Sequence, residues 1–173
     1  MKKTLLALCF GLSSIISADI TKLVTFQANF EQIIIDEQNK KITYKGNVIT
    51  SAPSFAMWKY NNPINKTVYV SKDKVVIVEP ELEQAIIKKI QSNLDFFSLL
   101  QQAKEIKKDL YVADYLQTKY FIKTEGLKIV SIVYTDEFEN RVQILFHDQK
   151  VNKKVDFKQF TPAIPQEFDI IND

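Results

Sequence analysis

Residues that build enzyme sites are scarce in this sequence of 173 residues, which contains one cysteine, one histidine and three glycines. A histidine without histidine or cysteine partners argues against a zinc site. So few glycines argue against phosphate-binding loops, and the sequence has neither a nucleophile elbow nor a zinc-protease motif. His147, at the end of an expected strand, is expected at the surface. We therefore expect no catalytic residue, no metal and no cofactor, and a protein that is not an enzyme.

The sequence also lacks a large excess of charge of either sign, because its 23 lysines and arginines are nearly balanced by 21 aspartates and glutamates. Loss of residues 1–18 would remove Lys2 and Lys3 and leave 21 residues of each sign. The charges are scattered rather than gathered in blocks. Because proteins that bind nucleic acid usually carry a basic surface, we expect no nucleic-acid partner.

The first residues, 1–18, have the pattern of a secretory signal peptide. Two lysines precede a short apolar run, and the small residue Ala18 offers a cleavage site. The apolar run is shorter than the ~20 residues that a membrane-spanning helix needs. Cleavage after Ala18 would leave residues 19–173, a length that suits a single domain.

Cys9 lies inside the predicted signal peptide. The residue before it is the bulky Leu8, whereas a lipoprotein signal has a small residue there. We therefore expect Cys9 to be removed with the signal peptide. The remaining chain would then have no disulfide and no thiol chemistry.

Most of the remaining chain is predicted to form short β-strands separated by turn residues. Gly46 is expected to mark a bulge or bend in the second strand. Residues 84–90 are ambiguous, because their isoleucines also fit a helix. The expected strands are residues 30–35, 42–50, three short strands within 53–85, 84–90, 110–116, 120–124, 127–134, 141–147 and a terminal piece at 168–171.

Two helices are predicted. Residues 19–26 have apolar positions at near-helical spacing, with Asp19 as the N-cap. Residues 93–103 place Leu94, Phe97 and Leu100 on one face, with Phe96 and Leu99 beside it. The polar residues 148–154 are expected to be a loop, residues 155–160 a short helix or turn, and no element is predicted for the charged residues 104–109.

These elements predict a mainly β fold of the α+β class. So many short antiparallel strands must curl over a core. We expect a half-open, strongly curved antiparallel β-barrel with a helical lid over its concave face. The lid residues would be Leu94, Phe96, Phe97 and Leu100.

Apolar side chains in the strands and in the lid are the candidate binding residues. Trp58, the only tryptophan, and Tyr60 are two positions apart, so they share a face of one strand. Each such residue taken singly could be ordinary core, but together they would line a hollow that a lid or an apolar ligand must fill. The predicted lipid-binding residues are Trp58, Tyr60, Val70, Val78, Phe97, Leu100, Ile132, Tyr134, Ile144 and Phe146.

Several of these positions also resemble a known family. The features are Phe30, Gln32 and Gly46 in the first two strands, Pro53, Trp58 and Pro63 around the third, the hairpin 71–74, Pro80 with Gln84, and Phe160 with Pro165. They resemble the LolA family of periplasmic lipoprotein carriers over nearly the whole chain. Two positions differ from the family, which commonly has an arginine where this sequence has Ala52 and a basic residue where it has Met57.

The resemblance implies a periplasmic chaperone that acts as a monomer. It would take acylated lipoproteins from the inner-membrane Lol ABC transporter and deliver them to an outer-membrane acceptor of the LolB type. Two alternatives remain open. One is a half-barrel sensor or interaction domain similar to the RseB regulators, and the other is a LolB-like outer-membrane receptor, which would need a lipidated cysteine.

Overall fold

The computed structural model describes residues 19–89 and 96–172. The predicted signal peptide and the predicted lid residue Leu94 lie outside the described residues. The described chain is almost entirely β-structure, with one short α-helix and three 3-10 turns. The helical elements are η1 (Ile20–Lys22), η2 (Pro80–Leu82), α1 (Phe96–Gln101) and η3 (Phe157–Phe160).

The strands form one twelve-stranded sheet in the order β12-β6-β5-β4-β3-β2-β1-β11-β10-β9-β8-β7. Neighbouring strands are antiparallel, except that β12 runs parallel to β6. The bounds are β1 (Thr25–Ile35), β2 (Lys41–Ser51), β3 (Phe55–Asn62), β4 (Lys66–Val70), β5 (Lys74–Glu79), β6 (Gln84–Lys89), β7 (Lys104–Lys107), β8 (Leu110–Tyr115), β9 (Thr118–Glu125), β10 (Lys128–Thr135), β11 (Arg141–Val151) and β12 (Asp169–Asn172).

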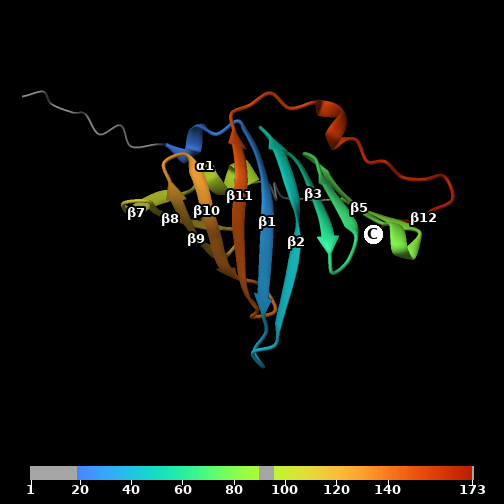
Figure 1. The fold of residues 1–173 in the computed structure, drawn as a ribbon, viewed down its shortest axis with the longest axis horizontal. Helices are drawn as coiled ribbons and strands as arrows, with labels where there is room; N and C mark the ends of the chain where they lie inside the picture. The colour runs from blue at the N-terminus through green and yellow to red at the C-terminus, as the bar shows by residue number, and fades with distance from the viewer. Residues whose placement is uncertain (1–18, 90–95, 173) are drawn as a thin grey trace, which may run out of the picture.

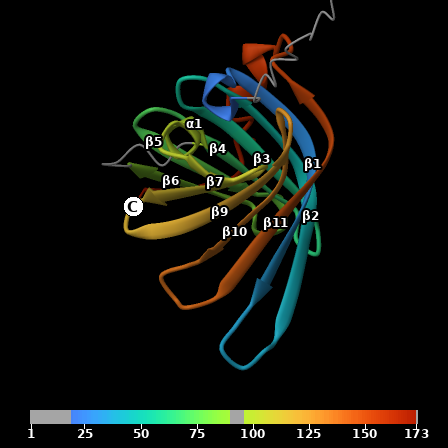
Figure 2. The same cartoon turned by 90° about the vertical axis from the view of Figure 1, so that its left-hand side faces the viewer.

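The sheet is curved but does not close. Its order ends at β7 on one side and at β12 on the other, and these two strands do not pair with each other. Figure 1 looks onto the outer face of the sheet, and Figure 2 shows the strands curling around α1 on the inner face. The expected mainly β fold with an unclosed, curved sheet is therefore confirmed.

Two matching turns explain why the chain reverses at the lower end of Figure 1. In the turn between β1 and β2, the Asp36 carboxylate accepts hydrogen bonds from the backbone N–H groups of Gln38 and Lys40, at 2.9 and 2.8 Å. In the turn between β10 and β11, Asp136 does the same for Phe138 and Asn140, at 3.0 and 2.9 Å. An aspartate that satisfies the turn's own backbone favours the reversal locally.

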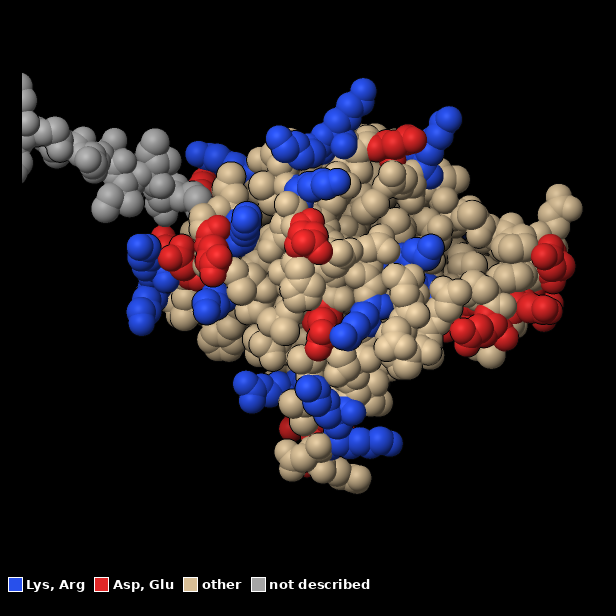
Figure 3. All heavy atoms as spheres, viewed as in Figure 1, with Lys and Arg blue, Asp and Glu red and all other residues tan. Residues whose placement is uncertain are grey.

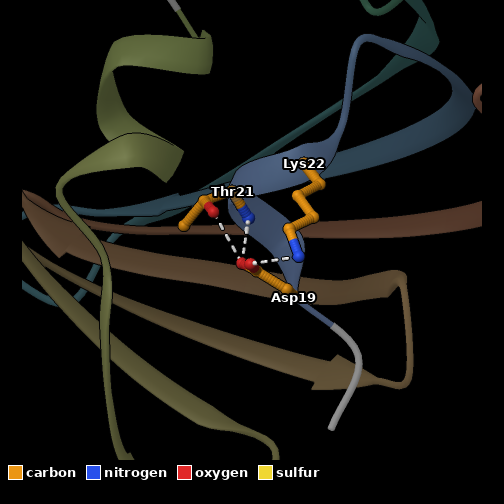
Figure 4. A network of polar contacts seen from close by, with 3 residues as sticks. All are labelled: Asp19, Thr21 and Lys22. Carbon is orange, nitrogen blue, oxygen red and sulfur yellow. Dashed lines mark hydrogen bonds and ion pairs between the residues drawn. The ribbon is translucent and has the colours of Figure 1, made fainter. Parts of the chain in front are cut away.

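The predicted helix at residues 19–26 is wrong beyond its first turn. Asp19 does cap η1, accepting hydrogen bonds from the backbone N–H and the hydroxyl of Thr21 at 3.0 and 2.6 Å, with Lys22 Nζ 3.5 Å from the same carboxylate (Figure 4). The chain then enters β1 at Thr25, and Phe26 is fully buried opposite Thr50. Pairing along two neighbouring strands outweighs the local helical spacing.

Other boundaries also differ from the prediction. Within the described residues, the central helix is only the six residues of α1. The charged residues 104–107 form the edge strand β7, and the predicted polar loop from residue 148 begins inside β11, which continues to Val151. Pairing with β1 carries β11 that far, from Ile35 opposite Arg141 to Phe26 opposite Val151.

The main core lies on the inner face of the sheet, where η1 and α1 pack against side chains of β1, β2 and β8–β11. In β11 every second residue from Val142 faces this core, since Val142, Ile144 and Phe146 are buried there. A second, smaller core lies on the other face of β5 and β6. There Val76, Val78 and Ala85 are covered by Ile164 and Phe168 of the C-terminal segment, which joins η3 to β12.

The outer face carries mixed charge. Figure 3 shows lysines and arginines interspersed with aspartates and glutamates over the face seen in Figure 1. Within residues 19–89 and 96–172, no helix is long and apolar enough to cross a membrane.

Candidate functional site

An apolar cavity of about 170 Å³ lies between α1 and the inner face of the sheet. It combines side chains from β3 and β4 with others from β8 to β11, so it joins strands that are distant in the sequence. Mostly aromatic and aliphatic walls are typical of sites for apolar ligands. The lining residues are Ala56, Trp58, Val70, Phe96, Leu99, Tyr115, Tyr120, Ile132, Tyr134 and Ile144.

A larger hollow of about 770 Å³ is a weaker candidate. It is open and lined by the charged side chains of Lys119, Asp136, Glu137 and Arg141 as well as by apolar groups. Phe121 and Val133, which also line it, point away from the inner face, because their neighbours Ile122 and Ile132 are buried in the core. The apolar cavity is the better candidate because it is the one bordered by both the sheet's inner face and a helix.

One wall of the cavity rests on a cluster of aromatic rings over β2. The Phe30 ring meets Trp58 and Tyr60 edge to face, with ring centroids 5.1 Å apart in each pair. Gly46 makes room for this cluster, because a Cβ there would collide with the Lys59 backbone carbonyl and lie 3.0 Å from Phe30. The predicted irregularity is confirmed, since the β2–β3 register shifts between Lys45 and Gly46.

The helix α1 presents two kinds of side chain. Phe97 and Leu100 are buried in the main core and fix the helix in place. Phe96 and Leu99 line the cavity, and the Phe96 ring stacks on Phe26 with a centroid distance of 5.1 Å. Of the predicted lid residues that the structure describes, Phe96 therefore borders the cavity, whereas Phe97 and Leu100 anchor the helix.

Tyrosine hydroxyls and the Trp58 indole N–H supply the few polar side-chain groups around the cavity. The rings of Tyr120 and Tyr134 lie 4.8 Å apart, and burial raises the pKa of both hydroxyls. Burial, with a smaller contribution from Tyr44, raises the pKa of Tyr60 to about 12. The Tyr60 hydroxyl lies 3.1 Å from Gln32 Oε1, and Lys66 Nζ lies 4.8 Å from the centre of the Tyr60 ring. These groups stay protonated near neutral pH, so the site carries no buried negative charge.

The structure brings most of the predicted binding residues together. Trp58, Val70, Ile132, Tyr134 and Ile144 line the cavity. Tyr60 and Phe146 belong to the aromatic packing beside it, where Trp58 approaches Phe146 with a centroid distance of 6.3 Å and Tyr60 packs against Phe30.

Val78 does not belong with them. The turn between β4 and β5 pairs Val70 with Val75, so Val70 and Val75 share the inner face, whereas Val76 and Val78 lie on the outer face. Val78 is buried there beneath Ile164 and Phe168 of the C-terminal segment. The prediction named Val70 and Val78 together, because the register of a hairpin cannot be read from alternation alone.

Four lining residues were predicted neither as binding residues nor as lid residues, namely Ala56, Leu99, Tyr115 and Tyr120. Alternation could have found two of them. Ala56 lies two positions before Trp58, and Tyr120 two positions before the buried Ile122. Leu99 and Tyr115 give no such signal, because α1 and β8 are brought to the cavity only by tertiary packing.

A protein-family model described as "Outer membrane lipoprotein carrier protein LolA" matches residues 21–163, most of the chain. The chain belongs to the LolA family. Curated relatives agree over almost the full length of both chains. A protein of Campylobacter jejuni is 36% identical over 171 residues and one of Wolinella succinogenes is 32% identical over 172 residues, with 99% of each chain covered. Both are named outer-membrane lipoprotein carrier protein.

Solved structures show the same fold at much lower identity. A LolA superfamily protein from Nitrosomonas europaea superposes with a TM-score of 0.55 at 10% identity, covering 84% of this chain and 94% of that one. An uncharacterized conserved protein from Thermus thermophilus gives 0.55 at 9% identity, covering 91% and 95%. At such identities the likeness concerns the fold alone.

Ala52, where LolA proteins commonly have an arginine, lies just after β2. Its side chain packs against the main core, and its backbone N–H donates to the Val24 carbonyl at 2.8 Å. An alanine side chain has no polar group with which to hold α1. The apolar contacts that hold α1 are made by Phe96, Phe97 and Leu100.

Proposed function

We propose that this protein is a periplasmic carrier that binds the acyl chains of lipoproteins released from the inner membrane and delivers them to the outer membrane. The carrier role is that of the family to which the chain belongs, and two nearly full-length relatives are named for it. The observation that carries the cargo site is the apolar cavity between α1 and the inner face of an open sheet.

The proposal includes the partners and the form of the protein. The inner-membrane Lol ABC transporter would hand over the acylated lipoprotein, and a LolB-like acceptor would receive it at the outer membrane. The carrier would act as a monomer made of one domain, residues 19–173, after removal of the signal peptide. Transfer of an intact lipoprotein between proteins breaks no covalent bond, so it needs no catalytic residue. Among the described residues, no group of three histidine, cysteine, aspartate or glutamate side chains is placed to hold a metal.

The size of the cavity requires that it open when cargo binds. Sites that enclose an organic ligand usually measure about 300–1,000 Å³, whereas this cavity measures about 170 Å³. We propose that α1 is a short lid that moves away from β3 and β4 to admit the acyl chains. Its movement would separate Phe96 from Phe26 and expose Leu99.

The free energy of lid opening also explains how the cargo can be released. Burial of a CH₂ group contributes about 0.8 kcal/mol, so three chains of roughly 16 carbons would contribute several tens of kcal/mol. That exceeds the limit of about 20 kcal/mol seen for non-covalent complexes. A lid that must be pulled from its own apolar contacts offsets part of this gain and keeps binding reversible.

Substitution in the lid tests the proposal. We expect Leu99→Glu to reduce retention of a three-chain lipopeptide at least tenfold, because it places a carboxylate in the cavity wall. The same loss is expected for Phe97→Asp, which disturbs the helix anchor. Native mass spectrometry of the purified protein with a synthetic lipopeptide measures the bound fraction.

The matched control is Leu82→Glu on η2, where the leucine is 64% exposed and away from the cavity. It should retain lipopeptide like the parent protein. Unchanged binding by Leu99→Glu would refute a cargo site under α1, provided that circular dichroism shows the variant to be folded.

The first residue of the mature protein shows whether the carrier is released without a lipid anchor. We expect N-terminal sequencing of protein secreted to the periplasm to begin at Asp19. A diacylated Cys9 at the N-terminus would instead indicate a receptor anchored to the outer membrane.

A further inference from the structure

The segment after β11 crosses the ends of three strands at the upper end of the sheet in Figure 1. Thr25, Ser51 and Phe55 lie in one row there, because Thr25 pairs with Ser51 and Ser51 pairs with Phe55. Residues 152–160 run across this row from β1 to β3, between the end of β11 and η3. At roughly 4.8 Å between neighbouring strands, the two steps make the row about 10 Å wide.

Hydrogen bonds fix the first part of this segment to β1. The Asn152 side-chain Oδ1 accepts from the Val24 backbone N–H at 2.9 Å, and the Asn152 backbone N–H donates to the Thr25 carbonyl at 2.9 Å. The Thr25 hydroxyl donates to the Lys153 carbonyl at 2.7 Å. Because these bonds use the backbone of Lys153, its side chain is left exposed to solvent.

Aromatic packing fixes the second part of the segment to β3. The centroid of the Phe55 ring lies 5.6 Å from that of Phe157 and 5.7 Å from that of Phe160, and the latter two are 5.6 Å apart. Phe157 nevertheless remains 57% exposed. The position of this ring is therefore fixed, while more than half of its surface is accessible to another molecule.

The same segment is basic in a chain whose charges nearly balance. Residues 150–160 contain four lysines and a single carboxylate, that of Asp156. Asp156 already accepts the Lys158 backbone N–H at 3.0 Å as the cap of η3. Within residues 19–89 and 96–172, none of the four lysines forms an ion pair. All four are exposed, namely Lys150, Lys153, Lys154 and Lys158.

Exposed apolar side chains accompany these lysines. Val24, which Asn152 holds by its backbone, is 54% exposed, and Phe157 lies at the other end of the row. Figure 3 shows basic side chains projecting from the upper end of the molecule, with uncharged surface between them. Clustered lysines attract anionic lipid headgroups, and apolar side chains among them add affinity by entering the boundary between headgroups and acyl chains. A projecting, basic and partly apolar surface therefore fits a flat anionic bilayer.

We infer that residues 150–160, together with Val24, form a docking surface for a bilayer that contains anionic phospholipid. The contact is reversible, because a few lysines and two apolar side chains bind far more weakly than a membrane-spanning helix. Val24 closely follows η1, and α1 packs against η1. Docking through this surface therefore brings α1, which borders the cavity, toward the bilayer. The inference goes beyond the proposed function, because docking needs no cargo.

Vesicle flotation with the protein purified from the periplasm tests the docking surface. We expect binding to vesicles of phosphatidylcholine mixed with phosphatidylglycerol, no binding to pure phosphatidylcholine vesicles, and loss of binding as the salt concentration rises. Lys153→Gln combined with Lys154→Gln should weaken binding to the anionic vesicles at least about tenfold. The matched control is Lys40→Gln combined with Lys41→Gln, an exposed pair at the β1–β2 turn at the opposite end of the sheet. It should weaken binding less than about twofold, because these lysines face away from the bilayer.

A pair of phenylalanines tests the apolar part of the surface. Phe157→Ser should weaken binding to the anionic vesicles at least about threefold. Phe138→Ser at the β10–β11 turn, where the ring is 72% exposed at the opposite end of the sheet, should leave binding unchanged. If Phe157→Ser does not fold, a bimane label on Phe157→Cys gives the second reading. Anionic vesicles should shift its fluorescence to the blue, and an unresponsive label overturns the inference.

The outcomes separate this inference from the proposed function. Equal weakening by the two lysine pairs shows an effect of net charge alone and overturns the docking surface. Absence of binding to anionic vesicles also overturns it and leaves an acidic protein as the partner that the lysines fit. Lipopeptide retention by the lysine variants should match that of the parent protein, because these lysines do not line the cavity. A protein that retains lipopeptide but ignores vesicles overturns this inference alone, whereas one that binds vesicles but no lipopeptide overturns the carrier function alone.

Discussion

The inner face of the sheet differs between its two halves. In the half made of β1 and β8–β11, the inner side chains are buried, and η1 and α1 pack on them. In the half made of β4, β5, β6 and β12, the inner side chains are partly exposed, and the C-terminal segment covers the outer face instead. Both halves have alternating, apolar strands. The comparison therefore teaches that alternation identifies an apolar face, whereas the segments that pack on that face decide whether it becomes buried core.

The largest difference between the two halves is expected in the free energy of unfolding, when one buried and one partly exposed side chain are truncated to alanine. We expect Leu100→Ala to lower the free energy of unfolding by about 2–5 kcal/mol, because Leu100 is 1% exposed in the filled half. Ile77→Ala in the open half should cost less than about 1.5 kcal/mol, because water already reaches part of that side chain. Urea denaturation measures both. Equal losses would mean that the open half is packed as tightly as the filled one.

A pair of glycines tests the boundary between the halves. Gly46→Ala should destabilise the protein by about 1–3 kcal/mol, because the new methyl group collides with the Lys59 carbonyl and crowds Phe30. Gly126→Ala is the control, since its site has open space but a φ of +61°, so only the backbone cost of about 1 kcal/mol applies. Thermal unfolding of both variants compares them. A smaller effect at Gly46 than at Gly126 would contradict the close contact between β2 and β3.

The smallest effect concerns Tyr60, which lies where the two halves meet. Its pKa is raised to about 12 by burial, above the ~10 of an exposed tyrosine. On raising the pH, the Tyr60 hydroxyl is therefore deprotonated first in the unfolded chain. The contribution of Tyr60 to the free energy of unfolding is constant below pH ~10 and falls as the pH rises toward 12. Urea midpoints measured between pH 9 and pH ~11.5 should show this decline, and Tyr60→Phe should reduce it. An identical decline in Tyr60→Phe would show that other groups cause it.

Local sequence features predicted much of the fold. The three strands between Pro53 and Ala85 and the bulge at Gly46 were predicted, because turn residues and period-2 alternation act within a few residues. The helix predicted at residues 19–26 was wrong, since long-range pairing with β2 draws Phe26 into a strand. The strand β7 was missed because its four side chains are exposed and give no apolar pattern.

The candidate site was predictable only in part. Trp58 was predicted because it shares a strand face with Tyr60, and Ile132 and Ile144 were predicted because they are apolar residues of expected strands. Val78 was predicted to bind lipid together with Val70, but it lies outside the cavity, because the turn that pairs Val70 with Val75 puts Val78 on the other face. Leu99 and Tyr115 reach the cavity through the packing of α1 against β8, which no local pattern reports.

The sequence by itself determined that the chain would form a curved antiparallel sheet with one strongly apolar face, and its motifs identified the LolA family. Periodicity, turn residues and glycine act locally, so they can be read in order along the chain. Only the tertiary structure decided which parts of that face η1 and α1 cover and which parts the described residues leave partly exposed. That outcome depends on strand register and on contacts between segments far apart in the sequence, and both are fixed by the packing of the whole chain.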